Sequence, residues 1–243
     1  MKKSKVLAKL NPKFLDGIGH RGLWNDKYTE NGINAFKNAI DHDVAFEFDI
    51  HLTKDNQLVV CHDENLKRTT GKNGIIEHLT LKEIKDNYRL LDGGDIPTLQ
   101  EVFDLNNEQV PMVIELKVYK KNYKPLAKKA MEMFAQIKDK RNAMIISFDP
   151  RSLWPLRKSG FIRSLLVAKS DEYTWKFRHT VESVDVDKQM FTQKRVQKYH
   201  KHYFVNCWTI ESNEDIETVL PYVDTMTFQH LDVALIKEKL NKN

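Results

Sequence analysis

Short apolar segments typical of β-strands alternate along this 243-residue chain with segments typical of amphipathic helices. Such alternation favours a parallel sheet whose strands are joined by crossover helices. A closed (β/α)₈ barrel commonly needs about 250 residues, so we predict a TIM barrel formed by one domain over residues 1–243. The β-type segments span residues 17–20, 45–50, 58–61, 112–117, 143–148, 164–168, 181–186, 203–208 and 225–227. The helical segments span residues 34–41, 81–86, 99–106, 124–138, 153–158, 188–201, 214–219 and 233–240.

This count of β-type segments is one too many for such a barrel. Segments 45–50 and 58–61 are joined through Asp55-Asn56, a link too short for a parallel crossover. We therefore expect that they form an antiparallel hairpin or that one of them lies outside the barrel. Residues 63–97 then interrupt the alternation, and we interpret them as a small insertion after an early strand, placed over the barrel mouth.

Two of the β-type segments carry charges in otherwise apolar surroundings. Glu47 and Asp49 stand two residues apart in one, and Glu115 and Lys117 stand two residues apart in the other. Residues at this spacing point to the same side of a strand. Carboxylates are almost never buried without partners, so three inward carboxylates indicate a bound cation, and oxygen ligands suit Mg²⁺ or Ca²⁺. The alternative is a buried ion-pair network of Glu115 and Lys117 with Arg21.

Two histidines follow strand-like segments. His20 is followed by Arg21-Gly22, and His62 is followed by Asp63. Singly, each histidine would more often be a hydrogen-bonded structural residue. Together with three carboxylates they predict an acid/base pair beside a metal ion. The guanidinium of Arg21 is a planar fork that fits a phosphate group.

The overall composition excludes several classes of protein. Mean hydropathy is −0.56, and no apolar segment approaches the roughly 18–20 residues that a membrane span needs. The basic N-terminal residues are not followed by an apolar stretch, so we expect a cytoplasmic protein without a signal peptide.

The net charge of +5 fits a phosphate-bearing substrate. The basic stretch 193–202 has the pattern of a solvated helix face, and no nucleic-acid partner is expected. Cys61 and Cys207 are interpreted as reduced core thiols.

Many of these residues stand in motifs that resemble those of the glycerophosphodiester phosphodiesterase family. The similarity is dense from about residue 18 to residue 117 and thinner afterwards. The combination is far more specific than any one motif. The matching motifs are residues 19–22 (GHRG), 30–31 (EN), 35–36 (AF), 47–55 (EFDIHLTKD), 59–63 (VVCHD), 66 (L), 68–71 (RTTG), 74 (G), 79–81 (LTL), 96–99 (IPTL), 115–117 (ELK), 147–148 (SF) and 208–209 (WT).

The resemblance implies a TIM barrel with a small insertion and one divalent cation, Mg²⁺ or Ca²⁺. It implies hydrolysis of a small-molecule glycerophosphodiester to sn-glycerol 3-phosphate and an alcohol. Carried over to this sequence, the family's roles give His20 and His62 as the acid/base pair, Glu47, Asp49 and Glu115 as the metal ligands, Arg21 and Lys117 as the phosphate-binding residues, and Trp208 as the residue beside the glycerol. The alternative for Trp208 is an ordinary core position.

The chain departs from the family pattern at two places. Thr29 and Gly32 stand where the family usually has Pro and Thr, and Asn31 is still expected to cap the following helix. Near the C-terminus the family's Asp-Gly and Thr-Asp are replaced by residues 224–229 (DTMTFQ). We therefore expect an unusual loop after the last strand and an altered pocket on the alcohol side.

Two other functions compete with this interpretation. The first is a related-barrel phospholipase, of the phospholipase D or phosphatidylinositol type, that acts on intact phospholipids. The second is a non-catalytic barrel that binds phosphate groups or lipid surfaces. Because every acid/base and ligand position is filled, hydrolysis of glycerophosphodiesters is the preferred hypothesis. No sequence feature predicts the head group, the choice of metal, the division of roles between the histidines or the oligomeric state.

Overall fold

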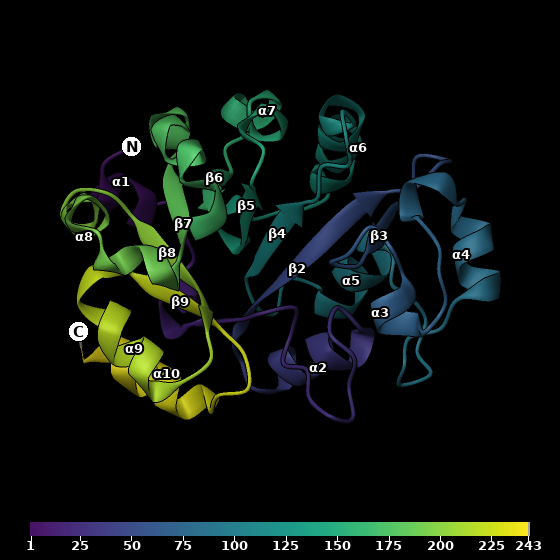
Figure 1. Ribbon diagram of the computed structural model, residues 1–243, viewed down its shortest axis with the longest axis horizontal. Coiled ribbons are helices and arrows are strands. Elements are labelled where there is room, and N and C mark those ends of the chain that lie inside the picture. The colour runs from purple at the N-terminus through teal and green to yellow at the C-terminus, as the bar shows by residue number, and fades with distance from the viewer. Residues whose placement is uncertain (243) are drawn as a thin grey trace.

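In the computed structural model, which describes residues 1–242, eight parallel strands close into a barrel (Figure 1). The strand order is β1-β9-β8-β7-β6-β5-β4-β2, and pairing of β1 with β2 closes the sheet. This arrangement is the predicted TIM barrel. The strands are β1 (Ile18–Gly19), β2 (Ala45–Leu52), β4 (Met112–Leu116), β5 (Ala143–Ser147), β6 (Ile162–Val167), β7 (Ser183–Asp187), β8 (Val205–Ile210) and β9 (Thr225–Phe228).

Helices surround the strands in Figure 1. The α-helices are α1 (Lys3–Leu7), α2 (Ile33–Asp41), α3 (Lys67–Thr70), α4 (Leu81–Asn87), α5 (Leu99–Asn106), α6 (Tyr123–Phe134), α7 (Pro150–Leu153), α8 (Lys194–His200), α9 (Asn213–Val219) and α10 (Val233–Asn241). The 3₁₀ helices are η1 (Pro12–Asp16), η2 (Ile76–His78), η3 (Lys140–Asn142), η4 (Pro155–Lys158), η5 (Lys169–Thr180), η6 (Lys188–Thr192) and η7 (Leu220–Tyr222).

The ninth β-type segment lies outside the barrel. Strand β3 (Leu58–Val60) pairs antiparallel with the C-terminal end of β2, with Val60 opposite Ile50. Asn56 adopts a left-handed conformation (φ 59°) in the turn between them. Both predicted possibilities therefore hold together: the two segments form a hairpin, and one of them is not part of the closed sheet.

The segment after β3 carries α3, η2 and α4, which lie at the edge of the molecule away from the N- and C-termini (Figure 1). It has a hydrophobic cluster of its own, which includes Leu66, Ile76, Ile84 and Tyr88. The interpretation of residues 63–97 as an insertion within one domain stays a prediction.

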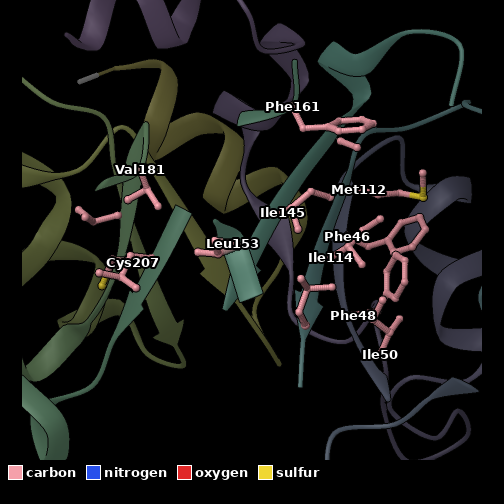
Figure 2. Packing of buried hydrophobic residues seen from close by; sticks show 14 of the residues in the cluster. Phe46, Phe48, Ile50, Met112, Ile114, Ile145, Leu153, Phe161, Val181 and Cys207 are labelled. Carbon is pink, nitrogen blue, oxygen red and sulfur yellow. The ribbon is translucent and has the colours of Figure 1, made fainter. Parts of the chain in front are cut away.

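Alternation along β2 separates the core from the functional face. Phe46, Phe48 and Ile50 pack outward against the helices (Figure 2), in the same cluster as Phe36 of α2. Ala45 belongs instead to the cluster that fills the lower barrel, together with Phe14 of η1. The positions between the outward residues are therefore left for polar side chains that point into the upper barrel.

Three predicted helices differ from the observed ones. The sequence predicts a helix throughout residues 124–138, but α6 ends at Phe134. Residues 153–158 form the 3₁₀ helix η4 after the short α7, with Pro155 at its start. Residues 188–201 are divided into η6 and α8 at Gln193, because the Asp187 side chain caps a separate 3₁₀ turn. No helix within residues 1–242 is long and apolar enough to cross a membrane.

Candidate active site

The predicted site residues gather where the barrel strands end. His20 and Arg21 follow β1, Glu115 lies in β4, and Lys117 follows it. The backbone turns sharply after His20, since Gly22 has φ +81° and a Cβ there would lie 2.8 Å from the Ala35 carbonyl carbon. Parallel strands deliver the residues at their C-terminal ends to one face of the barrel, and that face is the mouth.

Three buried carboxylates meet at the centre of this mouth. The exposed fractions of Glu47, Asp49 and Glu115 are 3%, 1% and 6%. Asp49 and Glu115 are directly paired neighbours on β2 and β4. One oxygen of each carboxylate lies within 4.8 Å of the others. Two oxygens on one Ca²⁺ lie at most about 5 Å apart, twice the metal–oxygen distance, so this spacing fits a single hard cation.

The electrostatics of the cluster favour a bound cation. Burial, followed by the charges of Asp49 and Glu115, raises the pKa of Glu47 well above its usual value. Burial also raises the pKa of Glu115 to about 7, although Lys117 opposes the shift. Burial alone would raise the pKa of Asp49, but the positive charges of Lys117 and Arg21 lower it instead. Two of the three carboxylates therefore resist ionisation, and a divalent cation would offset their repulsion.

Two basic side chains border the carboxylates. Lys117 Nζ lies 3.0 Å from Glu115 Oε1 and 3.4 Å from Asp49 Oδ1. Arg21 Nε lies 3.6 Å from Asp49 Oδ2, and the Arg21 backbone amide donates to Glu47 Oε2 at 3.0 Å. The predicted ion-pair network is thus present around the carboxylates. It does not exclude a cation, because three carboxylates outnumber the two basic groups.

The two histidines have different partners. His20 Nδ1 lies 2.7 Å from Gln229 Oε1, and His20 Nε2 lies 4.0 Å from Glu47 Oε2. His62 Nδ1 lies 2.7 Å from Asp63 Oδ1. Burial, followed by the charge of Arg21, lowers the pKa of His20 to about 4. Burial also lowers the pKa of His62, although Asp49 opposes the shift.

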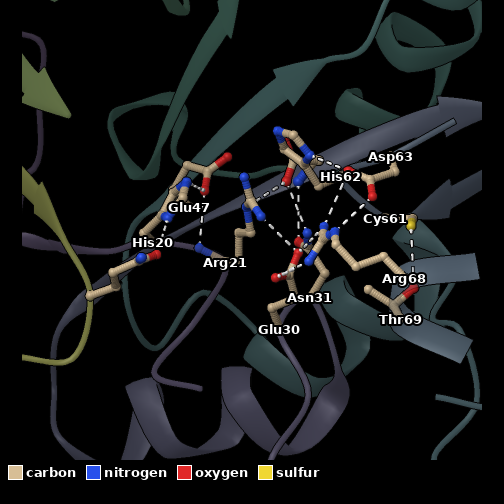
Figure 3. A network of polar contacts seen from close by, with 12 residues as sticks. His20, Arg21, Glu30, Asn31, Glu47, Cys61, His62, Asp63, Arg68 and Thr69 are labelled. Atoms are coloured by element: carbon tan, nitrogen blue, oxygen red, sulfur yellow. Dashed lines mark hydrogen bonds and ion pairs between the residues drawn. The ribbon is translucent and has the colours of Figure 1, made fainter. Parts of the chain in front are cut away.

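A second layer of charged groups links the two histidine loops (Figure 3). Glu30 accepts from Arg21 Nη1 at 2.8 Å and from Arg68 Nη1 and Nη2 at 2.7 and 2.8 Å. Arg68 Nε also donates to Asp63 Oδ2 at 2.7 Å, and Asp63 in turn holds His62. The loop after β1 and the segment after β3 are therefore joined by one continuous network.

Asn31 does not cap α2, and that prediction was wrong. The N-cap position is Gly32, and no side chain caps the helix there. The Asn31 amide instead donates to Asp49 Oδ2 at 2.9 Å, and its oxygen accepts from the Asp49 backbone amide at 3.3 Å. The buried carboxylate competes successfully for this side chain because an unpaired buried charge is far costlier than an uncapped helix.

Trp208 lies at the inner wall of the site, in β8. Its indole Nε1 donates to the Asp185 backbone oxygen at 3.1 Å, and its ring meets Phe148 edge-on at a centroid distance of 5.6 Å. A cavity of about 100 Å³ is lined by Trp208, His20, His62 and Glu115, among others. It shares His62, Glu115 and Phe148 with an outer hollow of about 420 Å³. A larger cavity of about 470 Å³ lies nearby, beside Trp24 and His230, and none of the three carboxylates lines it.

All eight predicted site residues therefore surround the barrel mouth. Sequence reasoning missed the roles of Glu30 and Arg68, although both stand in motifs that mark the resemblance. It also missed Asp185, a buried carboxylate that lines the inner cavity. A usable signal existed for Asp185, because residues 183–187 (SVDVD) alternate polar and apolar side chains as the segment of Glu47 and Asp49 does. No local pattern marked Gln229 as the partner of His20.

Comparison with known proteins gives consistent matches. The model of the glycerophosphoryl diester phosphodiesterase family matches residues 20–231. A glycerophosphodiester phosphodiesterase of Caldanaerobacter subterraneus is 36% identical over 149 residues, which cover 58% of this chain and 61% of the relative. Human lysophospholipase D GDPD1 is 39% identical over 129 residues, which cover 48% of this chain and 40% of the relative. The matched region thus spans less than two thirds of either relative.

Among solved structures, the glycerophosphodiester phosphodiesterase of Thermotoga maritima superposes with a TM-score of 0.72 at 26% identity. The superposition covers 93% of this chain and 97% of that one. The similarity therefore extends over the whole barrel, whereas the two sequence relatives match about half of the chain.

Proposed function

Because this chain belongs to the glycerophosphoryl diester phosphodiesterase family, we propose that it hydrolyses glycerophosphodiesters to sn-glycerol 3-phosphate and an alcohol. The observation that carries the proposal is the lining of one small cavity. Its lining includes two imidazoles, a guanidinium, two of the three clustered carboxylates and the apolar side chains of Phe148 and Trp208. Such a set can bind a phosphodiester, neutralise its charge and transfer protons on both sides of the phosphorus atom.

The proposal includes one divalent cation, Mg²⁺ or Ca²⁺, held by Glu47, Asp49 and Glu115. Support comes from the oxygen-only donor set, the spacing of the carboxylates within 4.8 Å and the raised pKa values of the two glutamates. When bound, the cation would polarise a phosphoryl oxygen and offset charge in the transition state.

Arg21 and Lys117 are proposed to hold the phosphate. Arg21 lines the inner cavity, and its Nε is buried without a hydrogen bond, 3.6 Å from Asp49 Oδ2. Burial alone would lower the pKa of Lys117, but the charges of Glu115 and Asp49 raise it, which favours the charged ammonium group. On the opposite wall, Trp208 would pack against the glycerol carbons with its ring face, since its Nε1 is occupied by Asp185.

His20 and His62 are proposed to be the acid/base pair. Both line the inner cavity, on opposite sides of the network that connects Arg21 with Asp63. One would take the proton of the nucleophile, which is either water or the glycerol hydroxyl next to the phosphate, and the other would give a proton to the departing alcohol oxygen.

We further propose that residues 1–243 act as one domain with an insertion at 63–97. The insertion supplies Arg68, whose guanidinium donates a hydrogen bond to Asp63. Asp63 in turn contacts His62 Nδ1, so Arg68 helps to hold the loop of His62 in place. A cytoplasmic location is part of the proposal, and the free, buried thiols of Cys61 and Cys207 agree with a reducing compartment.

The first test is the replacement of each histidine. We expect His20→Ala and His62→Ala each to lower kcat for glycerophosphocholine by about 10²–10⁴-fold, the usual contribution of general acid–base catalysis. His202→Ala is the matched control, because His202 is exposed and lies outside the cavity. Circular dichroism and thermal unfolding would show that each variant is folded. Full activity in either folded variant would remove that histidine from the mechanism.

The second test is removal of divalent cations. We expect a chelator to abolish turnover and added Mg²⁺ or Ca²⁺ to restore it, because the buried carboxylates repel one another without a cation. Glu115→Gln should require a higher cation concentration for the same rate. Turnover that persists in excess chelator would contradict the metal assignment.

A second candidate substrate is favoured by one observation, the 39% identity to human lysophospholipase D GDPD1. The outer hollow of about 420 Å³ continues from His62 towards Tyr119 and Pro150, which gives room beyond the phosphate. Parallel assays with glycerophosphocholine and lysophosphatidylcholine separate the candidates. Hydrolysis of the lysophospholipid alone would replace the preferred substrate, and binding without hydrolysis of either would indicate a non-catalytic module.

A further inference from the structure

Gln229 stands directly after β9, in the loop whose sequence departs from the family pattern. Its carboxamide oxygen lies 2.7 Å from His20 Nδ1, and its Nε2 donates to Glu211 Oε1 at 2.7 Å. Its backbone amide donates to the Ile210 oxygen at 3.0 Å, while the His20 amide donates to the Phe228 oxygen at 2.8 Å. The side chain is therefore fixed from both ends, between two loops of the barrel mouth.

The orientation of this carboxamide follows from its outer partner. The Glu211 carboxylate accepts hydrogen bonds and cannot donate them, so the Gln229 NH₂ group must face it. Glu211 is itself held by Lys188 Nζ at 2.9 Å, and Lys188 also lies 2.8 Å from Asp215 Oδ2. Only the oxygen of Gln229 is then left to face His20.

The orientation determines where His20 carries its proton. An imidazole nitrogen that faces a carboxamide oxygen must be the N–H donor. The proton of neutral His20 therefore sits on Nδ1, and Nε2 keeps its lone pair inside the cavity, 4.0 Å from Glu47 Oε2.

We propose that Gln229 is a positioning residue that fixes His20 in the Nδ1–H tautomer, so that Nε2 accepts the proton of the attacking hydroxyl. The inference rests on the proposed phosphodiesterase function and assigns His20 the base role. In the forward step the O–H bond of the nucleophile breaks, its proton forms a bond to Nε2, and the oxygen attacks phosphorus. The bond between phosphorus and the alcohol oxygen breaks, and His62, in its imidazolium form, gives its Nε2 proton to that departing oxygen while its Nδ1 faces Asp63. Gln229 holds the imidazole ring during this transfer and does not touch the substrate.

The proposal predicts a separation of rate and binding effects. Gln229→Met keeps the length of the side chain but removes both hydrogen bonds, so the ring can rotate and the Nε2–H tautomer becomes accessible. We expect kcat to fall by about tenfold to a hundredfold, a part of what general acid–base catalysis contributes, with KM changed far less. Gln109→Met is the matched control, because Gln109 is exposed in the loop before β4, at the opposite end of the barrel.

The tautomer itself is measurable without any activity. Nitrogen-15 chemical shifts of the imidazole rings distinguish Nδ1–H from Nε2–H, and the His20 signals are assigned by their loss in His20→Ala. We expect the Nδ1–H pattern in the wild-type protein and in Gln109→Met, and a shift towards Nε2–H or a mixture in Gln229→Met. If the protein proves inactive on every phosphodiester, the proposed function fails, and these spectra still decide the tautomer.

An exchange of the two side chains tests the chain of hydrogen bonds. In the double variant Gln229→Glu with Glu211→Gln, the new carboxylate at position 229 would accept a hydrogen bond from His20 Nδ1–H. The new carboxamide at position 211 would donate a hydrogen bond to that carboxylate. We expect this double variant to recover the Nδ1–H spectrum and most of the kcat lost in Gln229→Met. A wild-type spectrum with Nε2–H, or unchanged kcat and spectrum in Gln229→Met, would overturn the proposal.

Discussion

Asp185 gives the sharpest quantitative prediction, because its carboxylate is buried in the barrel without a basic partner. It lies in β7 with an exposed fraction of 1%. Its Oδ1 accepts from Ser164 Oγ at 2.6 Å, and its Oδ2 accepts from Asn206 Nδ2 at 3.1 Å. Burial raises its pKa to about 6, although both hydrogen bonds oppose the shift.

The sign of the effect on stability follows from proton linkage. Between about pH 4 and pH 6 the folded protein holds the Asp185 proton more tightly than the unfolded chain does. The contribution of Asp185 to the free energy of unfolding therefore falls as the pH rises from about 4 to about 6. Above about pH 6 this contribution no longer changes with pH. The difference between about 6 and the ordinary 3.8 corresponds to about 3 kcal/mol in the free energy of unfolding.

The perturbation is Asp185→Asn, which removes the titration and keeps the size of the side chain. We expect the stability of this variant relative to the wild type to increase by about 2.4 kcal/mol between pH 4 and pH 7, because the carboxyl of the unfolded wild type is already partly ionised at pH 4. Its hydrogen bonds add a constant offset that does not depend on pH. The prediction is therefore tested by how the difference in stability between variant and wild type changes with pH, and not by its size at any one pH.

The assay is urea unfolding at a series of pH values, with chelator in every sample so that cation binding does not vary. Asp26→Asn serves as the control for the replacement of a carboxylate by a carboxamide, because Asp26 is exposed. Ser164→Ala should move the pH range over which the Asp185 contribution to stability changes to higher pH, since it removes a hydrogen bond that favours the carboxylate. A stability difference for Asp185→Asn that is flat from pH 4 to pH 7 would refute the reasoning.

Two further predictions concern the scaffold. Thr98→Ala removes the capping box of α5, in which Thr98 Oγ1 accepts from the Glu101 amide, and should lower the free energy of unfolding by about 1 kcal/mol in urea titrations. Thr98→Ser keeps the capping hydroxyl and should cost less. Phe36→Ala empties a fully buried site where the ring stacks on Phe46 at 4.9 Å, and should cost about 3–5 kcal/mol by the same measurement. Phe36→Leu should cost clearly less, and equal losses in the two variants would contradict a packing origin.

The local pattern of the sequence was sufficient for the barrel and for its acidic cluster. All nine β-type segments form strands. Alternation of apolar and polar residues is typical of a strand with one buried face, and a continuous apolar segment is typical of a strand with two buried faces. Glu47 and Asp49 share a face for the same reason, since a spacing of two residues fixes the side of a strand. Pairing of Asp49 with Glu115 then follows once β2 and β4 are neighbours in a parallel sheet.

Contacts between distant segments were decided only by the closed barrel. Gln229 reaches His20 across 209 residues of sequence, and Arg68 reaches Glu30 across 38. Neither pair has a local signature, because hydrogen bonds between loops depend on where strand ends meet in space. Asn31 shows the same limit: its position just before α2 suggested a helix cap, but its side chain binds the buried Asp49 carboxylate of β2. The sequence by itself thus indicated the two histidines and the three clustered carboxylates of the mouth, whereas Asp185 was found only in the fold. The tertiary structure decided which of these groups hold one another, since only folding supplies the partners that buried polar groups require.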